Sequence, residues 1–129
     1  MSKDNTELVR GGYEAFGSGD MNAVMQLLQD TEWHEAEGAP QGGVYKGAEA
    51  ILAGVFGPLL QQLPDFKVTP HEVLPVGEDR VLAVGDYTGQ GEGGALHARF
   101  AHLWTVRDDK VTRFEQFADT ALMRQAVGS

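Results

Sequence analysis

Two ionisable side chains set among aromatic residues are the first candidates for chemistry in this sequence. His102 lies between Phe100 and Trp104 in the run 98–106, which is rich in aromatic and β-branched residues. Such a run is typical of a β-strand, in which alternate side chains share a face, so we expect these three residues to point to the same side. Histidine titrates near neutral pH and suits acid–base chemistry. The alternative is a core histidine whose hydrogen bonds are satisfied by its neighbours.

The second candidate is Glu35, which shares a strand face with Trp33 in the short alternating segment 32–37. A carboxyl group held against an aromatic side chain loses hydration, which raises its pKa towards neutrality and makes it a usable acid or base. The alternative is that Glu32, Glu35 and Glu37 form a solvated acidic edge.

Three further charged residues have a structural explanation beside a chemical one. Asp86 stands in the middle of an apolar strand and needs solvent or a partner, for which Arg99 on the next strand is the candidate. We expect this ion pair on the outer face of the sheet. Asp119 is expected to cap the last helix, the alternative being that Asp119-Thr120 closes the pocket of the hairpin. A hydrolase using Asp86, Arg99 and Asp119 is the catalytic alternative, and it requires Arg99 to point inward.

Two formal motif matches fail on their context. The segment 89–94 fits GxGxxG, but a strand follows it and an acid lies inside it, so we expect a flexible hairpin loop. His34-Glu35 begins like HExxH, yet no second histidine stands at the required position. His97 and His102 are an odd number of residues apart, so on one strand they point to opposite faces. We therefore predict neither a metal nor a cofactor.

The composition is that of a folded, acidic domain without cysteine. The 129 residues fit one domain, 1–129, and 42% of them are hydrophobic. A net charge of -9 opposes contact with phosphate backbones, so we expect no nucleic-acid partner. The N-terminus is polar and no apolar run is long enough to cross a bilayer, which predicts a cytoplasmic protein with no membrane contact.

Hydrophobic periodicity predicts helices first and then mainly strands, an α+β layout. Asp20 is the expected N-cap of the second helix, and Gly57-Pro58 is expected to kink or break the third. The strands carry apolar residues on both faces, so a homodimer through the outer sheet face is expected. The expected helices span 6–16, 20–28, 48–63 and 120–126, and the expected strands span 32–37, 66–74 with an interruption at Pro70, 80–88, 98–106 and 110–118.

Five short segments follow one another along the chain: Gly19-Asp20, Glu32-Trp33-His34-Glu35, GVYKG at 43–47, FAHLWT at 100–105 and FEQFADT at 114–120. With the order of the expected elements, they resemble the SnoaL-like polyketide cyclases and ketosteroid isomerase-related proteins, which have the nuclear transport factor 2-like (NTF2-like) fold. The resemblance extends from about residue 6 to residue 127. It implies a curved mixed, mainly antiparallel sheet wrapped around three to four helices, cone-shaped with an apolar cavity, without a cofactor.

The resemblance also implies roles for particular positions. The isomerase base, an aspartate, falls near Glu35, and the second acid of the isomerase falls near His102. The oxyanion-hole tyrosine falls near Gly12 or Tyr13. The acid–base aspartate of the cyclases falls on Gln116, which cannot transfer a proton, so neither reaction carries over intact.

The expected function is therefore a cofactor-independent enzyme of the isomerase or cyclase type, or a lyase, acting on a small apolar carbonyl compound. Glu35 is the expected base, and His102 is expected to donate a hydrogen bond to the developing enolate oxygen. The alternative is a non-catalytic protein that binds a small hydrophobic ligand or serves as a dimeric scaffold. The other residues expected in the pocket are Tyr13, Trp33, His34, Tyr45, Phe56, Phe100, Trp104 and Gln116.

Overall fold

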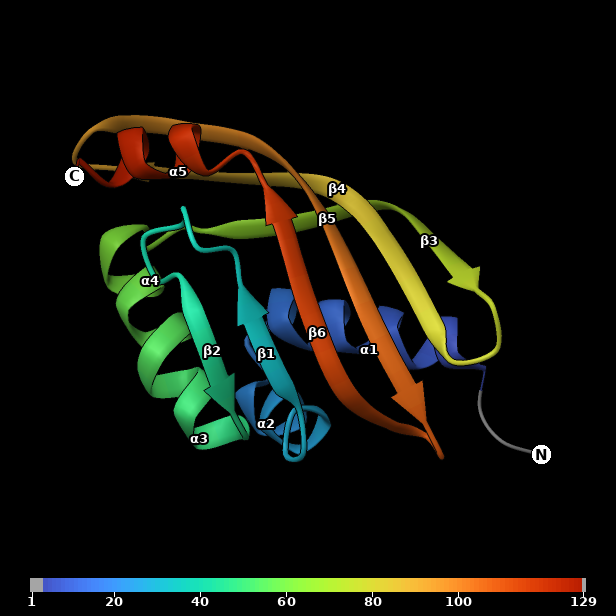
Figure 1. Ribbon diagram of the computed structural model, residues 1–129. Helices are drawn as coiled ribbons and strands as arrows, with labels where there is room; N and C mark the ends of the chain where they lie inside the picture. Colours follow the sequence, from blue (N-terminus) through green and yellow to red (C-terminus); the bar gives the residue numbers. More distant parts are fainter. Residues whose placement is uncertain (1–3, 129) are drawn as a thin grey trace.

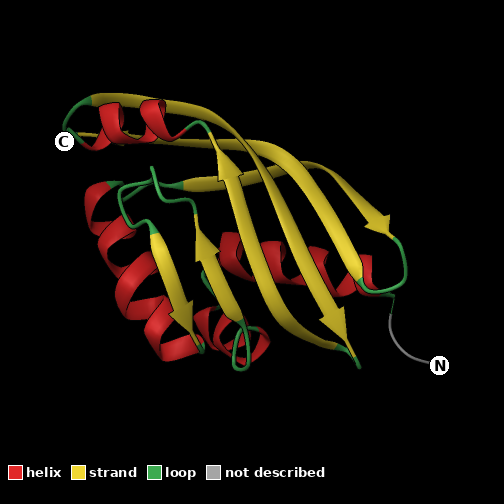
Figure 2. Cartoon of the chain, in the orientation of Figure 1, coloured by secondary structure: helices red, strands yellow, loops and turns green. Residues whose placement is uncertain are grey.

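A curved six-stranded sheet forms the centre of the protein (Figures 1 and 2). The structure, a computed structural model, describes residues 4–128. The strand order is β2-β1-β6-β5-β4-β3, and every neighbouring pair is antiparallel except β1 and β6, which are parallel. The strands are β1 (Glu32–Glu35), β2 (Gly43–Lys46), β3 (Lys67–Val76), β4 (Arg80–Gly91), β5 (Gly94–Arg107) and β6 (Lys110–Ala118).

The helices lie along one face of this sheet and at the end of its longest hairpin (Figure 1). Helices α1 (Asn5–Ser18) and α2 (Met21–Leu27) come before the sheet, and Asp20 caps α2 by accepting a hydrogen bond from the Ala23 amide, as predicted. The third helical segment consists of α3 (Ala48–Ile51), η1 (Leu52–Phe56) and α4 (Gly57–Gln62). Helix α5 (Thr120–Val127) packs on β5 and β4. The α+β class predicted from the sequence is confirmed.

The alternation of side chains along β5 determines which face of the sheet packs on the helices. Phe100, His102, Trp104 and Val106 are all buried, as predicted, while Arg99 is exposed on the opposite face. They join Val9 of α1 and other apolar side chains of the helices in the core. Burial of each large apolar side chain contributes about 1.5–3 kcal/mol, so this face fixes the register of the hairpin.

The third helical segment is not broken at Gly57-Pro58 but contains a π-helical turn directly before it. The amide of Gly57 donates to the carbonyl of Leu52, five residues back. Pro58 has no amide hydrogen, so the change in hydrogen-bond register leaves no donor unpaired at that position. π-Turns occur frequently at functional sites, and this one carries Val55 and Phe56 into the interior.

Two strand predictions are corrected, and one strand was not predicted. Strand β1 ends at Glu35, two residues before the predicted end, because the chain turns there. The four-residue strand β2 was not predicted. Pro70 does not interrupt β3: the irregularity is a β-bulge between Pro70 and Glu72, which lets the strand continue past the proline.

The glycine-rich segment 89–94 is not a flexible loop. Strand β4 continues to Gly91 and β5 starts at Gly94, so the hairpin turns within two residues. The Gly93 amide donates to the Ala126 carbonyl at 2.9 Å, and a β-carbon on Gly91 would overlap that same carbonyl. These glycines therefore allow α5 to lie directly against the hairpin.

The outer face of the sheet carries the charged residues that the sequence placed there. Asp86 and Arg99 are opposite each other in the β4–β5 register, but the hydrogen-bond partner of Asp86 is His71, at 2.6 Å, and not Arg99. This hydrogen bond holds the pKa of Asp86 below its usual value. Asp119 accepts a hydrogen bond from the Leu122 amide and so caps α5, as predicted. Because Arg99 points outward, the hydrolase alternative is excluded.

Candidate active site

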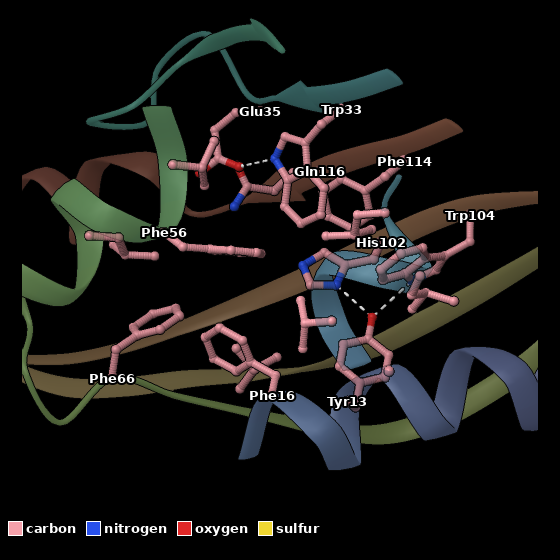
Figure 3. Close-up of a pocket in the computed structure, with 17 residues that line it drawn as sticks. Tyr13, Phe16, Trp33, Glu35, Phe56, Phe66, His102, Trp104, Phe114 and Gln116 are labelled. Carbon is pink, nitrogen blue, oxygen red and sulfur yellow. Dashed lines mark hydrogen bonds between the residues drawn. The ribbon is translucent and has the colours of Figure 1, made fainter. Parts of the chain in front are cut away.

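A small cavity of about 60 Å³ lies between the helices and the inner face of the sheet (Figure 3). Its wall is mainly aromatic and aliphatic, and four side chains contribute polar groups: Tyr13, Glu35, His102 and Gln116. An apolar cavity with a few convergent polar groups is typical of a small-molecule site. The aromatic residues of the wall are Phe16, Trp33, Phe56, Phe66, Trp104 and Phe114.

Glu35 is a buried carboxyl group held by its neighbour on the same strand face. The Trp33 Nε1–H donates to Glu35 Oε1 at 2.9 Å, and only 4% of the residue is exposed. Burial raises the pKa of Glu35 to about 7, although hydrogen bonds from Trp33 and Gln116 lower it in part. Among residues 4–128, no lysine, arginine or histidine forms an ion pair with this carboxyl. At neutral pH Glu35 is therefore divided between its charged and neutral forms.

Gln116 of β6 lies beside Glu35 because β1 and β6 are parallel neighbours in the sheet. Its Oε1 accepts a hydrogen bond from the Ala36 amide at 3.0 Å, and its Nε2 donates to the Tyr87 hydroxyl at 2.9 Å. A backbone amide can only donate, so this contact fixes which end of the Gln116 side chain is the oxygen.

His102 lies between two tyrosines. Its Nδ1 is 2.6 Å from the Tyr13 hydroxyl and its Nε2 is 2.5 Å from the Tyr87 hydroxyl, while Phe100 stacks on the ring with centroids 4.0 Å apart. Burial lowers the pKa of His102 to about 3, so the ring is neutral at physiological pH. Both ring nitrogens are engaged, so His102 donates to a ligand only if one of these hydrogen bonds breaks.

Tyr13 brings a hydroxyl group from α1 to the cavity wall opposite β1 (Figure 3). Besides His102, the hydroxyl contacts Trp104, whose Nε1–H donates to it at 3.0 Å. Burial raises the pKa of Tyr13 well above its usual value, so it is a neutral phenol.

Three residues predicted for the pocket do not line the cavity. His34 alternates with Trp33 and Glu35 and therefore points to the outer face, where its Nε2 lies 2.7 Å from Glu32. The Tyr45 hydroxyl donates to the Gln41 carbonyl at 2.8 Å, outside the cavity. Phe100 stacks on the ring of His102 and does not reach the cavity. The other predicted residues, Tyr13, Trp33, Glu35, Phe56, His102, Trp104 and Gln116, are brought together at the cavity.

Tyr87 and Phe114 are functional candidates that the sequence reasoning missed. Tyr87 is buried and contacts both His102 and Gln116, and Phe114 stacks on Trp33 with centroids 3.7 Å apart. Tyr87 lies on the same face of β4 as Val81 and Ala83, so its inward direction was readable from the strand pattern. Its contact with His102 depends on the register between strands, which the pattern does not give.

The described residues offer neither a metal site nor a helix that could span a membrane. Residues 4–128 contain no cluster of three or more histidine, aspartate or glutamate side chains arranged to hold a metal ion. None of the helices in that range has the length and hydropathy needed to cross a membrane.

The fold is that of a known protein family. Residues 9–114 match the family model of the SnoaL-like domain, and the chain belongs to this family. No curated protein matches the chain.

Solved structures with the same fold match nearly the whole chain. An NTF2-like protein from Burkholderia thailandensis is 30% identical with a TM-score of 0.91, covering 99% of this chain and 100% of that one. TerC, co-crystallised with polyporic acid, is 28% identical with a TM-score of 0.85 and coverages of 97% and 98%. A putative SnoaL-like polyketide cyclase from Shewanella denitrificans is 14% identical with a TM-score of 0.75 and coverages of 94% and 94%, which shows the fold alone.

Proposed function

We propose that this protein is a cofactor-independent enzyme of the isomerase or cyclase type, in which Glu35 transfers protons to and from a small carbonyl compound. The observation that carries this proposal is the state of Glu35: a carboxyl buried in an apolar cavity, without a cationic partner among residues 4–128, with its pKa raised to about 7. A base whose pKa is close to the working pH is present in its ionised form and still binds a proton strongly.

The proton balance of the proposed step is simple. The Glu35 carboxylate takes a proton from the carbon next to the carbonyl group, and the electron pair of that C–H bond moves to the carbonyl oxygen as an enolate. To isomerise the substrate, the neutral Glu35 returns the proton to another carbon of the conjugated enolate. To close a ring, the enolate carbon bonds to a second carbonyl carbon of the substrate, the π electron pair of that carbonyl moves to its oxygen, and the resulting alkoxide takes the proton from Glu35. Trp33 and Gln116 hold the carboxyl in place through the two hydrogen bonds described above.

One similar solved structure supports a small organic substrate. TerC, which is 28% identical to this chain, was co-crystallised with polyporic acid. The cavity of about 60 Å³ is smaller than the roughly 300–1,000 Å³ of ordinary ligand pockets. In this conformation it holds only a few non-hydrogen atoms, so a larger substrate requires wall side chains such as Phe56 to turn away.

Exchange of carbon-bound hydrogen tests this proposal without knowledge of the natural substrate. A panel of small ketones, beginning with acetone, is incubated with the protein in heavy water, and the loss of α-protons is followed by NMR. We expect exchange above the buffer rate, a rise in rate with pH to a plateau above about 7, and loss of exchange in Glu35→Gln.

The matched control for this experiment is Glu37→Gln, because Glu37 is an exposed glutamate two residues away. It should exchange like the wild type. Binding of a ketone without any exchange would overturn the enzymatic proposal and favour the alternative of a ligand-binding protein. Full exchange in Glu35→Gln would assign the base to another residue.

The uncovered face of the sheet supports a second copy of the chain as partner, which we also propose. Val44 of β2 and Phe117 of β6 are 61% and 55% exposed, and no helix within residues 4–128 packs on this face. Sedimentation should show a dimer that Phe117→Glu converts to a monomer. Leu122→Glu is the control, since Leu122 is exposed on α5. A monomeric wild type, or a dimeric Phe117→Glu, would refute this assembly.

A further inference from the structure

We infer that the hydrogen bonds from Ala36 to Tyr13 run in one direction, so that His102 carries its proton on Nδ1 and the Tyr13 hydroxyl donates into the cavity. The group bound there is then a hydrogen-bond acceptor, such as a carbonyl or enolate oxygen. The choice of this oxygen as part of the substrate rests on the proposed function, whereas the direction of the hydrogen bonds does not.

The backbone amide of Ala36 fixes the direction of the first hydrogen bond, because an amide N–H can only donate. Its N–H donates to Gln116 Oε1 at 3.0 Å, so the other end of the Gln116 amide is the NH₂ group. That group lies 2.9 Å from the Tyr87 hydroxyl and donates to it. The main chain thus decides that Tyr87 accepts a hydrogen bond from Gln116.

The hydroxyl proton of Tyr87 has one possible acceptor among its hydrogen-bond partners. Within residues 4–128, the hydrogen-bond partners of this hydroxyl are Gln116 Nε2, which is a donor, and His102 Nε2. Tyr87 is 3% exposed, and a buried donor without an acceptor is strongly disfavoured. The Tyr87 proton is therefore directed at His102 Nε2, which must be the unprotonated nitrogen of the ring.

The imidazole of His102 is neutral and carries its single proton on Nδ1. The two nitrogens of His102 contact tyrosine hydroxyls, and no carboxylate within the described chain lies within hydrogen-bonding distance of the ring to stabilise a positive charge. A neutral imidazole has one N–H, and since Nε2 is an acceptor the proton is on Nδ1. His102 Nδ1 therefore donates to the Tyr13 hydroxyl at 2.6 Å.

The last step leaves the proton of Tyr13 free. Its oxygen accepts from His102 Nδ1–H and from Trp104 Nε1–H, at 2.6 and 3.0 Å. Both acceptor positions of the oxygen are then used, and no acceptor for its own proton is present in residues 4–128. Tyr13 lines the cavity, so this O–H is available to a bound molecule (Figure 3).

Two consequences follow for the site. The free donor is held in place before any substrate binds, which is the arrangement that stabilises a developing oxyanion without reorganisation. Gln116 becomes a positioning residue: it hydrogen-bonds to Glu35 and, through Tyr87 and His102, determines that Tyr13 donates. A ketone oxygen can accept a hydrogen bond from Tyr13 and a hydrocarbon cannot, so the cavity distinguishes a ketone from a hydrocarbon of the same shape.

Nitrogen NMR of the protein with isotopically labelled histidine tests the direction without a substrate. The His102 signals are assigned by elimination, with variants that replace His34, His71 and His97 by glutamine. We expect a single tautomer protonated on Nδ1, and we expect Tyr13→Phe to keep it because the direction is set from the Gln116 side. Gln116→Leu should lose this preference. A ring protonated on Nε2 in the wild type would overturn the inference.

The free donor is tested with two ligands of one shape, acetone and isobutene, whose binding is followed through the indole N–H signals of Trp33 and Trp104. Tyr13→Phe should weaken acetone binding about fivefold and leave isobutene unchanged. Equal effects on the two ligands would refute the donor role. An Nδ1 tautomer without ketone exchange would overturn the proposed function alone, whereas exchange with an Nε2 tautomer would overturn this inference alone.

Discussion

Replacing Glu35 by glutamine should make the protein more stable at neutral and alkaline pH than the wild type. The substitution keeps the shape of the side chain and the acceptor for Trp33, but it removes a charge that has no cationic partner among the described residues. A buried, unpaired charge lowers the stability of the folded state. A gain in stability on replacement is typical of a residue that serves catalysis and destabilises the folded state.

The size of this gain in stability follows from the difference between the pKa values of Glu35 in the folded and unfolded states. The pKa of Glu35 is raised from 4.5 to about 7 on folding. Below pH 4.5 both states are protonated and the charge costs nothing. Between 4.5 and about 7 the unfolded chain loses a proton that the folded chain keeps, so wild-type stability falls as the pH rises. A gap of about 2.5 pH units corresponds to about 3 kcal/mol, fully present above about pH 7.

Urea unfolding of both proteins at a series of pH values from 4 to 9 is the assay. The stability of Glu35→Gln relative to the wild type should rise by about 3 kcal/mol across this range. Any constant effect of the amide appears at all pH values and does not alter this slope. Glu37→Gln, at an exposed position, should give a flat difference. A flat difference for Glu35→Gln as well would refute the claim that this carboxyl is buried and perturbed.

Substitutions at three other positions test parts of the same structure. Trp33→Phe removes the hydrogen bond that lowers the pKa of Glu35, so the midpoint of the pH-dependent step should move to higher pH in the same unfolding series. Gly54→Ala places a β-carbon into the ring of Tyr45 and should cost about 1–3 kcal/mol in urea unfolding; an unchanged midpoint would show that the π-turn adjusts freely. Asp119→Ala removes the cap of α5 and should cost about 1 kcal/mol, measured in the same way, whereas Asp119→Asn should cost less.

The strand pattern was the most informative part of the sequence. Alternation along β5 placed Phe100, His102 and Trp104 on the inner face, and the pairing of Trp33 with Glu35 on one face of β1 was also correct. The same rule, applied strictly, would have sent His34 outward. The sequence therefore contained the information needed to place His34 on the outer face.

Other features depend on contacts between distant segments, which local patterns do not show. The position of Tyr87 against His102 follows from the β4–β5 register, and the short strand β2 exists because it pairs with β1. Glycine-rich sequence at 89–94 is typical of a loop, but Gly91 and Gly93 are needed here because the backbone of α5 lies against them. The engagement of both His102 nitrogens, which removes it as a donor to substrate, was likewise invisible in the sequence.

Titration of the Glu35 carboxyl group by carbon NMR, in protein labelled at glutamate side chains and assigned with Glu35→Gln, is the most direct test of this account. We predict an apparent pKa of about 7, well above the value of 4.5 for a solvated glutamate, because the cavity removes water from the carboxyl. A midpoint near 4.5 would contradict it, since Glu35 would then be fully ionised and only a weak base at neutral pH.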